Sequence, residues 1–144
     1  MTNLISIYRF ANLAPVRKFG APSDFSFIFQ TPKEAAEFFD NGVAVAAPVP
    51  VGALSDLSVD FEYLGDHGVA ASEKVGSVFL YSNIKFEELD SSSEVFITGQ
   101  SATSVLLLYI LLKSRNKNSF PAIVNDLSEA DAYLIIGDEA LTFT

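Results

Sequence analysis

The chain has 144 residues, of which 49% are hydrophobic and only 19% are charged, which argues for one ordinary globular domain with a real core and against disorder. The formal net charge of −9 at pH 7 argues against binding to nucleic acid, because neutralising phosphates requires clustered lysine and arginine. There is no cysteine and one histidine, His67, so the sequence offers no disulfide or thiolate site and little material for a zinc site or a Ser–His pair.

No targeting or membrane-spanning segment is expected from the sequence. Charged and polar residues interrupt residues 1–20, which therefore lack the continuous apolar centre of a signal peptide. The longest apolar run, from Val105 to Leu112, is too short to cross a bilayer. We therefore expect a cytoplasmic protein that does not enter the membrane.

Strands and helices alternate in the first half of the chain. The apolar pattern predicts three strands, at residues 4–8, 25–29 and 43–47. A helix is predicted between the second and third strands, because Thr31 suits its N-cap, Pro32 its first position and Glu34 the third position of a capping box. Gly42 ends this helix. Such a strand–helix–strand unit predicts a parallel pair of strands with a right-handed crossover.

The second half of the chain continues the same alternation. Further strands are predicted at residues 60–64, 75–81, 94–98 and 131–136. A short helical turn is predicted at residues 86–89 and an apolar helix at residues 101–115. The fold class is therefore α/β with a mostly parallel sheet, and the serines at residues 91–93 are the expected linker.

Three segments carry the functional hypothesis. The segment from Phe10 to Val16 follows the first strand and contains a turn with asparagine and proline. The segment from Thr98 to Val105 is a hydroxyl-rich turn that opens the apolar helix, and helix N-termini of this kind bind anions. The segment from Asp131 to Leu141 is an apolar strand that ends in Gly-Asp and so delivers a carboxylate on a flexible turn.

In this order the three segments resemble the chorismate dehydratase family of the futalosine route to menaquinone, whose motifs read YLNALPL, SxTS and DAxLLIGDxAL. The resemblance implies a type II periplasmic-binding-protein-like fold, with two α/β lobes joined by a hinge and the ligand in the cleft between them. It implies a first lobe at residues 1–90 and an incomplete second lobe at residues 91–144. Family members continue well beyond the Gly-Asp turn, so we expect either a short variant or a piece of a longer protein.

The implied reaction is a carbon–oxygen lyase reaction, the dehydration of chorismate to 3-[(1-carboxyvinyl)oxy]benzoate. It removes one ring proton and one hydroxide, and aromatisation drives it. An enzyme therefore needs only to fix two substrate carboxylates, position a proton acceptor and assist the leaving hydroxyl. We expect no cofactor and no metal, and a small anionic aromatic or cyclohexadiene carboxylate as the partner.

The resemblance also implies the site residues. Hydroxyls at the start of the apolar helix are expected to bind a substrate carboxylate, namely Ser101, Thr103 and Ser104. Capping of the helix by Ser101 is expected in either case. Asn12 is the residue expected closest to the reacting ring, where it would orient the leaving hydroxyl; a turn-forming asparagine is the alternative. Ser77 and Asp138 are expected to bind the substrate near the cleft, with an ordinary strand serine and a turn cap as the alternatives.

Three residues depart from the family pattern. Ala102 stands where the family often carries arginine, and Ala71 and Glu73 stand where it usually has serine and glycine. An acid near an anion site would repel an acidic substrate. A non-catalytic protein that binds a small aromatic carboxylate is therefore the alternative function, and the dihydroxynaphthoate synthase of the same route is a weaker third option.

An assembly is also expected. In the family, later residues cover the apolar surfaces of the second lobe, so a chain ending at Thr144 should leave apolar surface and strand edges bare. We therefore expect a homodimer or a higher oligomer in which residues 94–144 provide much of the contact.

Overall fold

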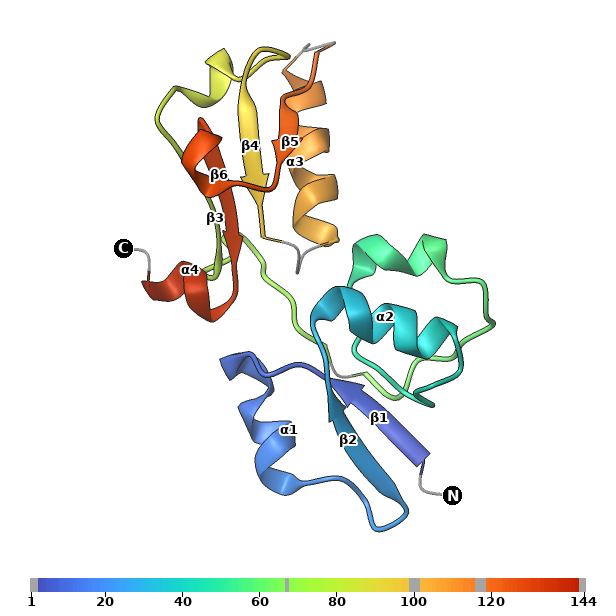
Figure 1. The fold of residues 1–144 in the computed structure, drawn as a ribbon. Helices are drawn as coiled ribbons and strands as arrows, with labels where there is room; N and C mark the ends of the chain where they lie inside the picture. The colour runs from blue at the N-terminus through green and yellow to red at the C-terminus, as the bar shows by residue number, and fades with distance from the viewer. Residues whose placement is uncertain (1–2, 67, 99–101, 116–118, 143–144) are drawn as a thin grey trace. The chain divides into compact units, whose positions relative to one another are not determined.

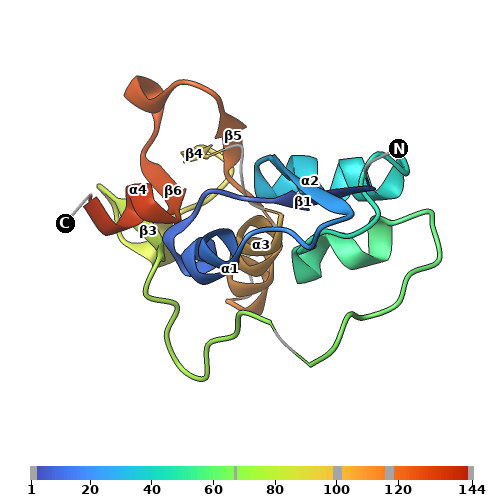
Figure 2. The same cartoon turned by 90° about the horizontal axis from the view of Figure 1, so that it is seen from below.

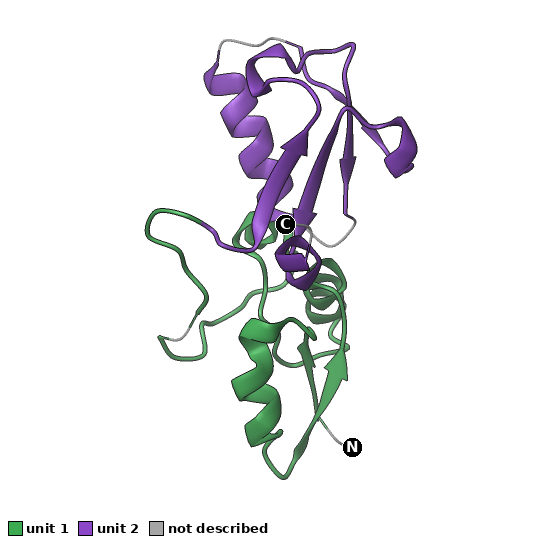
Figure 3. Ribbon diagram, turned by 90° about the vertical axis from the view of Figure 1, so that its left-hand side faces the viewer, with its two compact units in different colours: residues 1–74 green, residues 75–144 purple. Residues whose placement is uncertain are grey.

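The computed structural model describes residues 3–66, 68–98, 102–115 and 119–142. The chain forms two compact units, residues 1–74 and residues 75–144 (Figure 3). The boundary between these units lies earlier than the predicted lobe boundary at residues 90 and 91. The reason is that the strand after Val75 pairs with the last strand of the chain and so joins the second unit.

Unit 1 is built on two parallel strands, β1 (Asn3–Ile7) and β2 (Phe25–Phe29), which pair with Ile5 opposite Phe27 (Figure 1). Both strands confirm the prediction. The connection between them contains a short 3-10 helix, η1 (Ala11–Leu13), and helix α1 (Ala14–Phe19). A proline at the second position of α1 is compatible with the helix, because an amide there would have no partner within the helix.

Helix α2 (Pro32–Asp40) begins with the predicted capping box. The Thr31 hydroxyl accepts from the Glu34 amide at 3.3 Å, and the Glu34 carboxylate accepts from the Thr31 amide at 2.8 Å. These hydrogen bonds from Thr31, the backbone one first, lower the pKa of Glu34. The buried face of the helix contains Ala35 and Ala36, and α2 packs against β1.

The prediction of a buried strand at residues 43–47 is wrong, because this segment does not form a regular strand. It is reduced to one parallel bridge between Ile5 and Ala46, in which the Val45 amide donates to the Leu4 carbonyl oxygen at 2.9 Å. The direction of pairing is parallel, as predicted, and β1 lies between β2 and this segment. The pairing stops here because Pro48 lacks an amide donor and restricts the residue before it.

The rest of unit 1 is irregular. After the 3-10 helix η2 (Val51–Asp56), the described residues between 57 and 77 contain neither helix nor strand (Figure 2). The strand predicted at residues 60–64 is therefore wrong; its side chains are exposed, because the alternating pattern finds no partner strand. The segment is tied down at its start, where the Asp40 carboxylate accepts from the Ser58 amide at 2.6 Å and the Val59 amide at 3.2 Å.

Unit 2 contains a four-stranded sheet in the order β3-β6-β4-β5. Its strands are β3 (Val78–Ser82), β4 (Glu94–Ile97), β5 (Ala122–Val124) and β6 (Ala132–Ile136). β4 pairs in parallel with β5 and β6, and β3 pairs antiparallel to β6. Strands β4 and β6 fall within the predicted segments, and β3 overlaps the segment predicted at residues 75–81. Strand β5 was not predicted, since a three-residue strand leaves almost no periodic signal.

The helices of unit 2 are α3 (Thr103–Ser114), α4 (Asp138–Thr142) and two 3-10 turns, η3 (Phe86–Glu88) and η4 (Leu127–Glu129). Helix α3 lies against one face of the sheet (Figure 1). Its buried residues Leu108 and Leu112 join Val95, Leu134 and Leu89 in the core. The predicted fold class, α/β with mostly parallel sheets, is confirmed, and it is consistent with a two-lobe α/β binding-protein-like fold.

Candidate functional site

The residues predicted to bind a ligand map largely to one edge of the sheet in unit 2. Strands β4 and β6 run parallel, so their carboxyl ends lie at the same edge. Strand β3 begins at this edge because it runs antiparallel to β6. We call it the carboxyl edge, and it comprises Ser77, Thr98, the start of α3 and the Gly137-Asp138 turn. Open α/β sheets bind ligands outside the carboxyl ends of their parallel strands.

Ser77 and the Gly-Asp turn are joined by a backbone hydrogen bond. The Gly137 amide donates to the Ser77 carbonyl oxygen at 2.8 Å, which extends the pairing of β3 with β6 by one step. Gly137 has a φ of 71°, a left-handed conformation that favours glycine. The turn therefore places Asp138 beside Ser77, although the two residues are far apart in the sequence.

Asp138 is exposed and is the first residue of α4. A carboxylate at this position interacts favourably with the positive end of the helix, which agrees with the turn-cap interpretation. The same exposure leaves its carboxylate accessible at the carboxyl edge. Both interpretations are therefore compatible with the position of Asp138.

The start of α3 contributes hydroxyl groups to the same edge. Thr103 and Ser104 are half-buried in the first turn of the helix, where the positive end of the helix dipole attracts anions. The N-cap position is occupied by Ala102, whose methyl side chain offers no acceptor, and the helix begins at Thr103, two residues later than predicted. Ser101, predicted to cap the helix and bind a carboxylate, lies outside the described residues.

Thr98 is also a polar residue of the carboxyl edge. No function was predicted for it from the sequence. Its amide donates to the Leu134 carbonyl oxygen at 3.2 Å, which fixes the end of β4 on β6. The side chain is only 7% exposed, and its hydroxyl has no hydrogen-bond partner within the described ranges. Leaving a buried hydroxyl unpaired costs about 1–3 kcal/mol. In the sequence, the only indication that Thr98 belongs to the site was its position as the first residue of the hydroxyl-rich turn.

Asn12 belongs to unit 1 and lies in η1, just beyond the carboxyl end of β1, where it is exposed. The turn that carries it is held by Arg17, whose guanidinium donates to the carbonyl oxygens of Phe10 at 2.8 Å and Tyr8 at 3.3 Å. Burial raises the pKa of the Tyr8 hydroxyl. The side chain of Arg9 stacks on the Phe29 ring with 4.2 Å between its guanidinium carbon and the ring centre, a cation–π contact.

The structure thus brings four of the predicted site residues to one edge of unit 2: Ser77, Thr103, Ser104 and Asp138. Asn12 occupies the corresponding end of β1 in unit 1. Ala71 and Glu73, two of the departures from the family pattern, are exposed in the segment that precedes β3. The roles assigned to all these residues stay predictions.

The arrangement has the polar groups that a small carboxylate requires. Hydroxyls at a helix start supply donors without a cationic side chain, and one carboxylate at the same edge supplies a proton acceptor. None of the helices in the described part of the chain is long and apolar enough to cross a membrane.

Comparison with known proteins adds one match. A family described as menaquinone biosynthesis matches residues 4–144, which include both compact units and all three of the segments that carry the functional hypothesis. No curated protein matches the chain.

Proposed function

The chain belongs to the menaquinone biosynthesis family, and on this premise we propose that it acts as a chorismate dehydratase-like lyase that forms 3-[(1-carboxyvinyl)oxy]benzoate. The observation that carries the proposal is the convergence of Ser77, the start of α3 and Asp138 at the carboxyl edge of unit 2. This edge combines hydroxyl donors with the carboxylate of Asp138, which suits a substrate that is an anion and must lose a proton.

In the proposed reaction one ring C–H bond and one ring C–O bond break, and the proton and hydroxide leave together as water. No electron acceptor is needed, because the ring becomes aromatic by elimination alone. Thr103 and Ser104 hydrogen-bond a substrate carboxylate at the positive end of α3. Ser77 hydrogen-bonds the substrate from the neighbouring strand.

Two residues are proposed to act on the groups that leave. Asn12 orients the departing hydroxyl by hydrogen bonding, since an amide is a poor base. Asp138 carries the only carboxylate among the assigned residues and can accept the ring proton. Its negative charge makes it unsuitable for binding a substrate carboxylate, because like charges repel at short range. We also propose a cytoplasmic location for the reaction.

The experiment follows chorismate with the purified full gene product and measures the loss of the diene absorbance. The expected result is slow conversion in the wild type and a rate loss of at least tenfold in Ser104→Ala. The matched control is Ser114→Ala at the other end of α3, where the hydroxyl donates to the Leu111 carbonyl oxygen. The control should retain the wild-type rate.

Binding is measured separately by the shift in melting temperature on adding chorismate, since a ligand selective for the folded state stabilises it. A shift without any change in absorbance over hours would replace the lyase with the alternative function, a binding protein for a small aromatic carboxylate. If neither the shift in melting temperature nor the conversion of chorismate is observed, both proposed functions are contradicted.

A further inference from the structure

Helix α3 has a second apolar face that its own sheet does not cover. Leu108 and Leu112 point into the core, whereas four other apolar residues are 45–54% exposed: Leu106, Leu107, Ile110 and Leu111. Their spacing of three and four residues places them on one side of the helix, roughly opposite the core residues. We call this set the leucine stripe.

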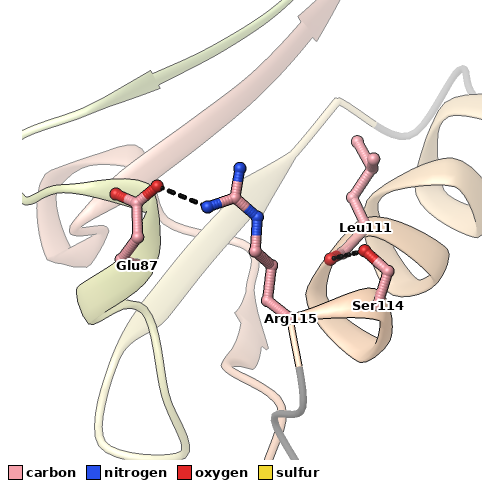
Figure 4. A network of polar contacts seen from close by, with 4 residues as sticks. All are labelled: Glu87, Leu111, Ser114 and Arg115. Carbon is pink, nitrogen blue, oxygen red and sulfur yellow. Dashed lines mark hydrogen bonds and ion pairs between the residues drawn. The ribbon is translucent and has the colours of Figure 1, made fainter.

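The stripe lies in an uncharged stretch of the sequence. No charged residue occurs between Val95 and Leu112, although the whole chain has a net charge of −9. Beyond this stretch, Arg115 at the end of α3 forms an ion pair of 2.8 Å with Glu87 of η3. Figure 4 shows Arg115 reaching Glu87, with Leu111 one turn earlier in α3. The stripe is therefore an apolar surface whose charged neighbours on α3, Lys113 and Arg115, lie at the carboxyl end of the helix.

A helix that is apolar around its whole circumference is normally buried on all sides. Four half-exposed side chains of this size form a patch on the order of 300–400 Å², which is in the range of functional patches on a monomer. Two such patches with their rims reach the total of about 1,000 Å² that a specific interface requires.

We propose that the leucine stripe of α3 packs against the same stripe of a second copy of this chain, related by a two-fold axis. An apolar stripe without charges is complementary to itself, and an isologous interface requires such self-complementarity. It also allows two strongly acidic chains to approach without bringing carboxylates together. Packing of ridges into grooves then joins the two α3 helices side by side.

The first test measures molecular mass by sedimentation over a range of micromolar concentrations of the full chain. The wild type should have the mass of a dimer, and Leu107→Glu should weaken the dimer at least tenfold because it buries like charges against each other. The matched control is Leu64→Glu, an exposed leucine of unit 1 that lies outside the stripe. A wild type that stays monomeric throughout, or a control that dissociates to the same extent, would overturn the proposal.

The second test keeps the proposal falsifiable if the glutamate variant does not fold. The chain has no cysteine, so a single introduced cysteine can form a disulfide only between two copies. Under mild oxidation Ile110→Cys should form covalent dimers at least tenfold faster than Leu64→Cys. Equal rates would mean that unit 1 or another protein segment covers the stripe instead of a second copy.

Discussion

The guanidinium of Arg17 donates a hydrogen bond of 2.8 Å to the carbonyl oxygen of Phe10. The same oxygen accepts from the Leu13 amide at 3.0 Å, so two donors hold the turn that carries Asn12. A turn that is fixed from both sides keeps its side chains in place, and a displacement of about 1 Å near a reacting group can cost about a hundredfold in rate. Arg17 therefore fixes the turn in which Asn12 lies.

Replacing Arg17 by methionine keeps the aliphatic stem and removes the hydrogen bonds to Phe10 and Tyr8. We expect a loss of about 1–2 kcal/mol in the free energy of unfolding, because a charged donor is lost from two carbonyl oxygens. Urea denaturation measures this loss. The control is Lys18→Met, which removes an equal charge from an exposed neighbour on the same helix. If both variants lost the same free energy of unfolding, the loss would come from the removed positive charge and not from the hydrogen bonds of Arg17.

Gly137→Ala tests the turn at the carboxyl edge. A φ of 71° in an alanine costs about 1–2 kcal/mol, and the strain would disturb the hydrogen bond between the Gly137 amide and Ser77. We expect a lower melting temperature and a smaller thermal shift with chorismate. Gly76→Ala is the matched control, because its methyl group would meet open space and its φ lies outside the left-handed region. The prediction is contradicted if the two alanine variants behave alike.

Thr98→Val removes a buried hydroxyl and keeps the shape of the side chain. Since this hydroxyl has no hydrogen-bond partner within the described residues, we expect the variant to be more stable than the wild type by about 1 kcal/mol. The melting temperature of the ligand-free protein is the measurement. A clear loss of stability would indicate that the hydroxyl is paired in solution.

The hydrogen bonds that the Asp40 carboxylate accepts from the amides of Ser58 and Val59 depend on pH. Hydrogen bonds lower its pKa, the one from the Ser58 amide most strongly. A carboxyl whose pKa is lowered by folding stabilises the fold above its unfolded pKa, and this contribution is lost as the pH falls through the folded pKa. We therefore expect amide exchange at Ser58 and Val59 to accelerate below the ordinary titration range of aspartate. In Asp40→Asn the amides of Ser58 and Val59 should exchange faster than in the wild type already at neutral pH. In the control Asp60→Asn, which changes an exposed residue, their exchange should stay the same.

Local chemistry alone was sufficient to predict several elements. The capping box of Thr31 and Glu34 specified the start of α2, because its two hydrogen bonds join residues only three apart. The alternating pattern specified β2 to the residue, and the apolar run ending at Gly137 specified β6. In each case the determining interactions lie within one segment, and of these only the segment of β6 is among the three on which the family resemblance depended.

Tertiary structure decided what depends on a partner far along the chain. Residues 60–64 have a strand pattern and residues 122–124 have almost none, yet only the second segment forms a strand, because β4 offers it an edge. The closeness of Ser77 to Asp138 likewise depends on the antiparallel pairing of β3 with β6, which no local pattern encodes. The residue types of the candidate site were therefore readable from the sequence, whereas their meeting at one edge follows from the order in which the strands pair.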